Sequence, residues 1–412
     1  MKNLRVLKFG GSSVADVEKI KHVAKIIANY KKKGFKVVVV VSAMGNTTDN
    51  LIELANKVNP HPEKRELDML LATGEQVSSA LLAMALQNLG LKAIAFSGYQ
   101  VKIITDKIHT KARIITIDTK RLRKELNEDK IVVVAGFQGI SAYTQDITTL
   151  GRGGSDLTAV ALAYALNADL CEIYTDVEGI FTADPKIVKS ARKLDFISYD
   201  EMLELASTGA QVMQTRSIEV AKKFNVKIEV KSTFSKKGGT MIGRISKEIE
   251  APLISGISLN TKEAKITICG VPDRPGIAAK IFNEIAKENI NVDMIVQNVS
   301  HKGLTDISFT VSKEDLDKAF QITQNVAKKI KAQNVLKDEN IARVSVVGIG
   351  MKTQAGVAGK VFKTLAENKI NIEMISTSEI SISCIIKKQD AKKAVSALHK
   401  RFKLDKIKVQ KK

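Results

Sequence analysis

Four short segments of the chain combine residue types that can bind phosphate and carboxylate groups. The first, residues 8–13 (KFGGSS), places Lys8 two residues before a pair of glycines. Glycines let backbone N–H groups approach an anion closely, and a lysine adds a mobile positive charge. The spacing is neither that of a Walker A loop nor that of a protein-kinase Gly-rich loop. The segment therefore predicts a phosphate-binding turn, with an ordinary strand-to-helix turn as the alternative.

Two further segments favour a polar ligand and a carboxylate. Residues 41–49 (VSAMGNTTD) gather small hydroxyl and glycine residues, although an ordinary loop has the same composition. Residues 148–156 (TTLGRGGSD) place Arg152 among glycines, just before a helix of small residues. A guanidinium group can clamp a carboxylate through two parallel hydrogen bonds, and the helix start adds N–H donors. We therefore interpret Arg152 as a ligand-binding residue.

Acidic residues mark the fourth segment and one isolated position. Residues 174–186 (YTDVEGIFTADPK) concentrate carboxylates and a lysine that could hold a nucleotide or its Mg²⁺. The alternative for this segment is a charged surface loop with an Asp-Pro turn. Glu75, in TGEQ (73–76), is the other acidic candidate, and its alternative is a glutamate that the helix dipole favours in a first turn.

The elements that must position these residues alternate along the first 248 residues. Short Val- and Ile-rich runs are separated by amphipathic helical stretches, which predicts an α/β fold: an open, mainly parallel sheet sandwiched by helices. The candidate segments follow strands, at the sheet edge where open α/β folds bind ligands. The predicted strands are residues 4–9, 36–42, 93–97, 131–137, 170–175 and 226–231.

An internal duplication begins after residue 248. Residues 276–295 and 356–375 share nine identities in twenty positions at an offset of 80. Each copy has the pattern of a βαββαβ ferredoxin-like unit. We predict a catalytic domain at 1–248 and two α+β regulatory domains at 249–340 and 341–412, with a pure dimerisation scaffold as the alternative for the repeat.

Composition excludes several protein classes. Lys and Arg number 65 against 44 Asp and Glu, giving a formal charge of +21 over 412 residues. The lysines are dispersed over helix faces without interleaved aromatics, so nucleic-acid binding is the weaker interpretation. The three cysteines, Cys171, Cys269 and Cys384, show no metal-ligand or disulfide spacing, and the apolar runs are too short for a membrane span. We expect a cytoplasmic protein without a signal peptide.

Taken together and in this order, the segments resemble the aspartate kinases of the amino-acid kinase superfamily over essentially the whole chain. The resemblance rests on the four segments, on TGEQ (73–76) and GFQG (136–139), and on the paired C-terminal modules, which are similar to ACT domains. It implies phosphoryl transfer from MgATP to the β-carboxylate of L-aspartate, giving 4-phospho-L-aspartate and ADP. This is the first step of lysine, threonine and methionine biosynthesis.

The resemblance also assigns roles to individual residues. Lys8 would neutralise charge on the transferring phosphoryl group, Arg152 would clamp the α-carboxylate of aspartate, and Glu75 would bind its α-ammonium group. The implied ATP-binding residues are Lys8, Gly10, Gly11, Ser12, Ser42, Tyr174, Thr175, Asp176, Phe181, Asp184 and Lys186. The implied substrate-binding residues are Thr47, Glu75, Arg152, Gly153, Gly154 and Ser155. Mg²⁺ would accompany ATP, with no direct protein ligand predicted.

The C-terminal modules carry the implied regulatory site. In the first copy the matching positions are Asp273, Pro275, Gly276, Ile277, Ala278, Asn291 and Gln297. In the second copy Gln354-Ala355-Gly356 replaces the usual His-Pro-Gly, so this copy is expected to serve mainly as a partner surface. The layout is similar to the subclass inhibited by lysine plus threonine, in a homo-oligomer or in a complex with a small ACT-only subunit.

The chemistry agrees with what the segments lack. A carboxylate is already ionised at neutral pH, so the nucleophile needs no general base, and none of the five histidines falls in a candidate segment. Three alternatives remain: another kinase of the superfamily, a non-catalytic amino-acid sensor, and a nucleic-acid binder.

Overall fold

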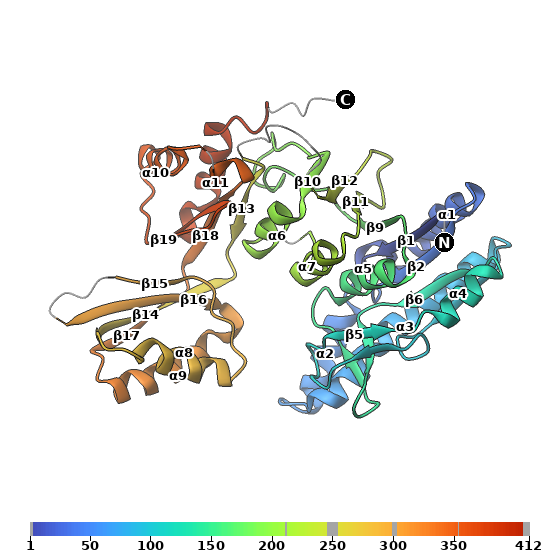
Figure 1. Ribbon diagram of the computed structural model, residues 1–412, viewed down its shortest axis with the longest axis horizontal. Helices are drawn as coiled ribbons and strands as arrows, with labels where there is room; N and C mark the ends of the chain where they lie inside the picture. Colours follow the sequence, from blue (N-terminus) through green and yellow to red (C-terminus); the bar gives the residue numbers. More distant parts are fainter. Residues whose placement is uncertain (1–2, 211, 245–253, 299–302, 353, 407–412) are drawn as a thin grey trace. The chain divides into compact units, whose positions relative to one another are not determined.

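The chain forms two compact units in the computed structural model (Figure 1). The structure describes residues 1–412 except 1–2, 211, 245–253, 299–302, 353 and 407–412. The first unit comprises Met1–Ile180, Lys193–Ala206 and Gln211–Glu248. The second comprises Phe181–Arg192, Ser207–Ala210 and Ile249–Lys412, so two short segments of the predicted catalytic range belong to it.

An eight-stranded sheet forms the centre of the first unit, with the strand order β10-β12-β11-β9-β1-β2-β6-β3. All of its neighbouring strands are parallel except β11 and β12, which confirms the predicted mainly parallel sheet. The strands are β1 (Leu4–Phe9), β2 (Lys36–Val41), β3 (Ala93–Phe96), β6 (Ile131–Ala135), β9 (Leu170–Thr175), β10 (Phe196–Ser198), β11 (Ile228–Ser232) and β12 (Thr240–Gly243).

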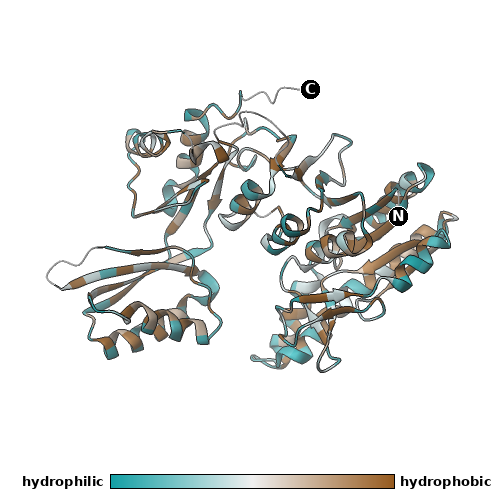
Figure 2. Ribbon diagram, viewed as in Figure 1, coloured by the Kyte–Doolittle hydropathy of each residue, from teal (hydrophilic) through white to brown (hydrophobic). Residues whose placement is uncertain are grey.

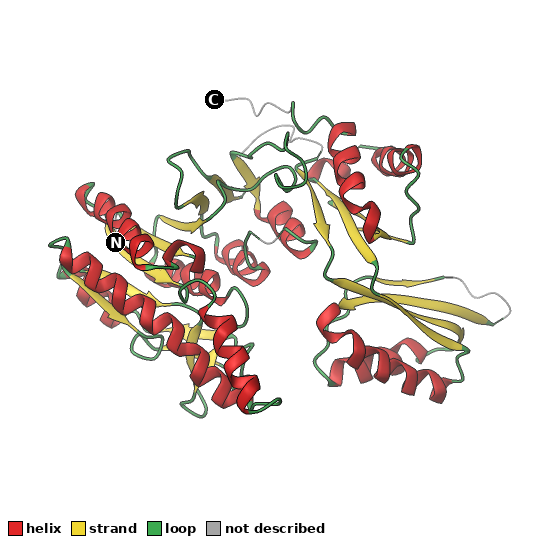
Figure 3. Ribbon diagram, turned by 180° about the vertical axis from the view of Figure 1, so that it is seen from behind, coloured by secondary structure: helices red, strands yellow, loops and turns green. Residues whose placement is uncertain are grey.

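Helices cover both faces of this sheet (Figure 3). Leu7 and Phe9 of β1 pack into one core cluster with α1 (Val17–Lys32) and α3 (Lys64–Asn88). Side chains alternate along a strand, so Lys8 points to the opposite face, where α5 (Gly154–Leu166) contacts β1, β2 and β9. The remaining helices are η1 (Gly11–Val14), α2 (Thr47–Val58), α4 (Lys120–Asn127), α6 (Tyr199–Ser207) and α7 (Thr215–Phe224).

Helix α3 is long and apolar enough to cross a membrane by length and composition alone. Half of its apolar window is buried inside the protein, and Asp68 and Glu75 are buried within it. The core helix of a soluble protein passes the same test, so this helix is weak evidence for a span.

A smaller sheet of the first unit was not predicted from the sequence. It has the order β5-β4-β7-β8 and is built from β4 (Ile103–Thr105), β5 (Ile114–Ile117), β7 (Gln138–Ser141) and β8 (Ile147–Thr149). Helix α3 packs against β8.

Two four-stranded antiparallel sheets form the second unit, as predicted for paired ACT modules. The first has the order β15-β16-β14-β17, from β14 (Glu263–Pro272), β15 (Ile295–Gln297), β16 (Leu304–Ser312) and β17 (Asn334–Asp338), with α8 (Ile277–Lys287), η2 (Lys313–Asp315) and α9 (Leu316–Ile330). The second has the order β13-β18-β20-β19, from β13 (Gly256–Asn260), β18 (Ile341–Val347), β19 (Met374–Thr377) and β20 (Ser381–Lys387), with η3 (Ile349–Lys352), α10 (Val357–Glu367), η4 (Lys388–Asp390) and α11 (Ala391–Arg401).

The chain contributes to the second sheet before it enters the first. Strand β13 lies within the range predicted for the first module, yet it pairs with β18 as an edge strand of the second sheet. β13 thus occupies the place in the second sheet that β17 occupies in the first. Apolar residues are concentrated in the strands of both units (Figure 2).

Candidate active site

The side chain of Lys8, in β1, reaches the start of helix α5. Its Nζ atom is 2.6 Å from Oδ1 of Asp156, and both side chains are largely buried, at 11% and 8% exposed. Asp156 belongs to the first turn of α5, whose N–H groups give that end of the helix a positive character. The amine, an acidic partner and a helix N-terminus therefore meet at one point.

The glycine pair after β1 allows a close approach to the second segment. A Cβ atom at Gly11 would lie 2.8 Å from the carbonyl oxygen of Ala43. The N–H group of Gly45 donates to the carbonyl oxygen of Gly11 at 3.1 Å, and that of Gly10 donates to Tyr174 at 3.2 Å. The predicted phosphate-binding turn is thus fixed between β2 and β9, with Lys8 Nζ 3.5 Å from the position of a Cβ at Gly10.

Helix α3 brings Glu75 to the same loop. Glu75 is 3% exposed, and its Oε1 atom accepts a hydrogen bond from the N–H group of Ala43 at 3.1 Å. Its Oε2 atom has no hydrogen-bond partner among the residues that the structure describes. Burial raises the pKa of Glu75 to about 7, outweighing the hydrogen bond from Ala43. Ser42 is fixed here as well, because its carbonyl oxygen accepts from Ser78 Oγ at 2.8 Å.

Thr47 and Arg152 both lie near the start of α2. A Cβ at Gly74 would lie 3.5 Å from Cγ2 of Thr47, the first residue of that helix. The guanidinium Nη2 atom of Arg152 is 3.7 Å from Oδ1 of Asp49, in the first turn of α2. The Arg152 side chain is 86% exposed, so it is available to a ligand.

These contacts connect the residues that the sequence proposed. Lys8 pairs with Asp156, four residues after Arg152. Arg152 in turn approaches the first turn of α2, which begins at Thr47. Thr47 lies against Gly74, the residue before Glu75. Gly153, at φ 74°, precedes α5, while Gly154 and Ser155 begin that helix and are buried. The structure therefore brings Lys8, Thr47, Glu75 and Arg152 together at one end of the first-unit sheet.

The fourth segment is only partly placed near this group. Tyr174 is 5% exposed, its ring stacks on Phe9 at a centroid distance of 4.6 Å, and its hydroxyl is 2.7 Å from that of Tyr30. Burial raises the pKa of Tyr174 to about 12. Its side chain therefore belongs to the core with α1, and its carbonyl oxygen is the group that reaches the glycine turn.

Other residues of that segment remain sequence predictions as nucleotide ligands. Thr175 Oγ1 donates to Asp176 Oδ1 at 3.0 Å in the first unit. Phe181, Asp184 and Lys186 belong to the second unit, where the N–H group of Lys186 donates to Asp184 Oδ1 at 2.8 Å.

The predicted effector-binding residues lie around the start of α8. Asp273, Pro275, Gly276 and Ala278 are exposed between β14 and the first turn of this helix, beside the half-buried Ile277. Asn291 and Gln297 are exposed after the helix, and Gln297 ends β15. Gly276, at φ 87°, precedes α8 as Gly356, at φ 89°, precedes α10, so the two copies share this helix start.

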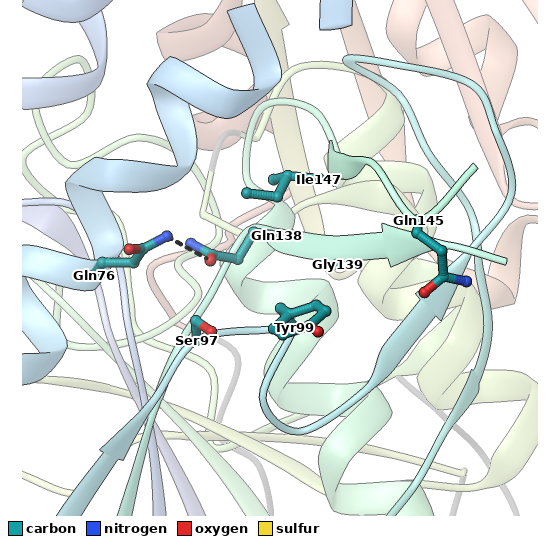
Figure 4. A pocket seen from close by; sticks show the side chains of 7 residues that line it. All are labelled: Gln76, Ser97, Tyr99, Gln138, Gly139, Gln145 and Ile147. Carbon is teal, nitrogen blue, oxygen red and sulfur yellow. Dashed lines mark hydrogen bonds between the residues drawn. The ribbon is translucent and has the colours of Figure 1, made fainter. Parts of the chain in front are cut away.

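Two polar features escaped prediction from the sequence. Buried Asp68 accepts hydrogen bonds from Thr149 Oγ1 at 2.5 Å and His109 Nδ1 at 2.8 Å. A cavity of about 310 Å³ lies beside Gln76 (Figure 4), where Gln76 Nε2 donates to Gln138 Oε1 at 3.3 Å. The lining residues are Gln76, Ser97, Tyr99, Gln138, Gly139, Gln145 and Ile147. For Asp68 a sequence signal existed: it lies seven residues before Glu75 in an apolar helix, so both carboxylates share one helix face.

Comparison with known proteins identifies the family. The model of the amino acid kinase family matches residues 3–232, and that of the ACT domain matches 266–325 and 344–402. An aspartokinase of Pseudomonas aeruginosa is 51% identical over 404 residues, covering 98% of this chain and 98% of that protein. The chain belongs to the aspartokinases. An aspartokinase of Corynebacterium glutamicum is 48% identical over 405 residues, covering 97% of this chain and 96% of that protein.

Solved aspartokinase structures share the fold. Aspartokinase III of E. coli in complex with aspartate and ADP matches 97% of this chain and 99% of its own, with a TM-score of 0.82 at 26% identity. The same enzyme with lysine and aspartate matches 97% of this chain and 100% of its own, with a TM-score of 0.75 at 26% identity. As an aspartokinase, the chain is an aspartate kinase, an ATP-dependent phosphotransferase with a carboxyl-group acceptor and two ACT regulatory domains.

Proposed function

We propose that the first unit transfers the γ-phosphoryl group of ATP to the β-carboxylate of L-aspartate at the group formed by Lys8, Thr47, Glu75 and Arg152. The observation that carries this assignment is the 2.6 Å ion pair of Lys8 with Asp156 at the start of α5, four residues after Arg152. It supports a shared site in which the amine serves the nucleotide and the guanidinium serves the acceptor.

Lys8 contributes charge neutralisation. Phosphoryl transfer spreads negative charge over the transferring oxygens, and catalysis depends on positioned positive groups more than on covalent chemistry. Asp156 holds the Lys8 ammonium group in a largely buried place, so little reorganisation is needed during the reaction. The backbone N–H groups of Gly11 and Ser12, next to Lys8, would cradle the phosphates.

Aspartate recognition falls to the other three residues. Arg152 is exposed and gives up only a 3.7 Å ion pair when it clamps the α-carboxylate. Glu75 supplies a buried carboxylate for the α-ammonium group, and one of its oxygens has no hydrogen-bond partner in the described part of the chain. Thr47 lies against the neighbouring Gly74. This arrangement leaves the β-carboxylate to face ATP.

In the first unit, the nucleotide pocket would include Ser42, Thr175 and Asp176. The resemblance also implies Phe181, Asp184 and Lys186 as ATP-binding residues. Mg²⁺ is commonly held by one or two carboxylates together with substrate phosphates. We therefore infer that it enters with ATP. Among the described residues there is no group of three or more His, Cys, Asp or Glu side chains that could hold a metal ion by itself.

The ACT modules would bind the effectors lysine and threonine, acting in concert, at Asp273, Pro275, Gly276, Ile277, Ala278, Asn291 and Gln297. Exposure of most of these positions supports a site that a second ACT module can complete. An effector that binds one arrangement of the protein better than another shifts the equilibrium by that difference in affinity. Activity that is unchanged by lysine and threonine, alone or together, would remove this part of the proposal.

The assembly and the location follow the same resemblance. We infer a cytoplasmic homo-oligomer, or a complex with a small ACT-only subunit, that binds neither nucleic acid nor membranes. Native mass measured on protein purified from its own cells distinguishes the two assemblies. Retention on duplex DNA or RNA at physiological salt would contradict the absence of nucleic-acid binding.

One assay tests the reaction directly. Incubation with MgATP, L-aspartate and hydroxylamine should trap the acyl phosphate as a hydroxamate. L-Glutamate and N-acetylglutamate in place of aspartate should give little product. A preference for either of these acceptors would assign the site to another reaction of the superfamily.

A further inference from the structure

The start of helix α7 contacts the loop that carries Arg152. Gln214 precedes α7, and its Nε2 atom donates a hydrogen bond to the carbonyl oxygen of Arg152 at 2.9 Å. The N–H group of Gln214 donates to Asp156 Oδ2 at 3.4 Å, beside the oxygen that pairs with Lys8. A Cβ at Gly153 would lie 3.0 Å from the Cβ of Gln214, so the two segments are in close contact.

Arg216 binds the same loop at Leu150, two residues before Arg152. Its Nη1 atom donates to the carbonyl oxygen of Leu150 at 2.7 Å, and its Nη2 atom donates to that of Ala112 at 2.8 Å. Hydrogen bonds from a charged donor are about twice as strong as neutral ones. The planar guanidinium group thus joins two backbone segments at once.

Helix α7 is a firm base for these contacts. Ser217, Ile218 and Ala221 of α7 are fully buried. Val220 packs against a small apolar cluster formed by Ala112, Leu150 and Leu157, which includes the first residue of the loop. The two donors are therefore fixed relative to α5.

The loop is also held by backbone hydrogen bonds, because the N–H groups of Leu150 and Gly154 donate to the carbonyl oxygens of Phe137 and Gly151 at 2.8 Å each, but its side chains add little. Gly151 and Gly153 flank Arg152 with φ angles of 82° and 74°, and neither contributes a side chain. The Arg152 side chain is 86% exposed and forms one ion pair at 3.7 Å. The side-chain bonds to the carbonyl oxygens of Leu150 and Arg152 lie on either side of Gly151, so they help to set the direction in which the Arg152 side chain leaves the backbone.

We propose that Gln214 and Arg216 are positioning residues for aspartate binding, acting through the backbone of residues 150–156. This inference rests on the proposed role of Arg152 in binding aspartate. Both residues lie outside the four candidate segments, so the start of α7 would also contribute to the affinity for aspartate.

The test uses substitutions that preserve size and helix. Gln214→Met keeps the length of the side chain and removes the donor, while Gln214→Glu keeps its shape and places an acceptor against the carbonyl oxygen. We expect each to raise the KM for aspartate about tenfold, which corresponds to about 1.4 kcal/mol, and to leave the KM for ATP within about twofold. Arg216→Lys should act in the same direction because an ammonium group cannot join both carbonyl oxygens in a fixed plane.

Lys223→Gln, on the exposed face of α7, is the matched control and should leave both KM values unchanged. Thermal midpoints show whether each variant folds. An unchanged aspartate KM in the folded Gln214 variants, or an equal rise in both KM values, would overturn the inference.

Arg152→Ala and the double variant Arg152→Ala/Gln214→Met separate the two ideas. If Arg152→Ala leaves the aspartate KM unchanged, the proposed site fails. If it raises that KM and Gln214→Met does not, only the present inference fails. If Gln214 acts through Arg152, the double variant should be no worse than Arg152→Ala alone, which a merely structural effect would not produce.

Discussion

Lys8 and Asp156 form a largely buried ion pair, and removing Lys8 should affect both catalysis and stability. Lys8→Met should lower kcat by about 10²–10³-fold, as expected when a positioned charge is lost from the transition state. It also leaves Asp156 without its cationic partner, which destabilises the fold. Steady-state kinetics beside thermal unfolding check both effects. Near-wild-type turnover in a folded variant would refute the role of Lys8.

Glu75 should make aspartate binding dependent on pH. Its pKa is raised from 4.5 to about 7, so below about pH 7 the carboxyl group becomes neutral and attracts an ammonium group less. The KM for aspartate should therefore rise as the pH falls from 8 to 6, and Glu75→Gln should flatten this dependence. An unaltered pH profile in Glu75→Gln would assign the titration to another group.

The same pKa shift makes the fold more stable at low pH, whereas aspartate binding is favoured at higher pH. Since the folded protein binds the Glu75 proton more tightly than the unfolded chain does, its contribution to stability is complete below pH 4.5. That contribution is lost as the pH rises through about 7, and amounts to about 3 kcal/mol. The buried site thus disfavours the charged form of Glu75 that substrate binding requires, and keeping this carboxylate ionised above pH 7 costs the fold that stability.

At the scale of residues, the sequence indicated candidate side chains but not their orientation. Lys8 and Arg152 were singled out for their residue types and glycine neighbours, and their roles stay predictions. Tyr174 was expected in the nucleotide pocket, but its side chain lies in the core beside Phe9. Gln214 and Arg216 were not singled out, because a glutamine and an arginine at a helix start have no pattern of their own.

The turn after β1 depends on a glycine at position 11. Gly11→Ala would place a methyl group 2.8 Å from the carbonyl oxygen of Ala43, so the turn or the neighbouring loop must move. We expect a higher KM for ATP and a loss of about 1–3 kcal/mol in stability. Gly238→Ala, at a first-unit glycine with open space around it and no left-handed φ, controls for a generic glycine effect. If both variants retain the ATP affinity, the turn is not a phosphate site.

At the scale of elements, the long Val-rich strands were predicted almost to the residue. β1 was expected at 4–9 and is Leu4–Phe9, because a buried parallel strand reads as one continuous apolar run. The sheet of β4, β5, β7 and β8 was missed. Its strands have only three or four residues, which is too short for a clear alternating pattern, and β4 pairs with β7 across 36 residues, as in Ile104 with Ile140.

At the scale of the whole molecule, the chain passes repeatedly between its two units. The duplication predicted two consecutive modules, and the family of the fold was confirmed. The intertwining was not predictable, because pairing of β13 with β18 depends on partners more than eighty residues apart. Within the second unit, Arg343 bonds to the carbonyl oxygen of Ser207 at 2.9 Å and pairs with Glu263 at 2.6 Å, so residues 207–210 are tied to the ACT modules.

Residues 181–192 belong to the second unit, which affects how a fragment ending at residue 248 should behave. Ala183 and Val188 are buried in one apolar cluster with Val344, Val346 and Leu398 of the second ACT module, and Ile187 and Ala191 pack against it. A polypeptide ending at residue 248 would carry these side chains uncovered and should precipitate on expression. Co-expressed with residues 249–412 as a separate chain, it should stay in solution and co-purify with that chain, because the residues of this apolar cluster are divided between the two fragments.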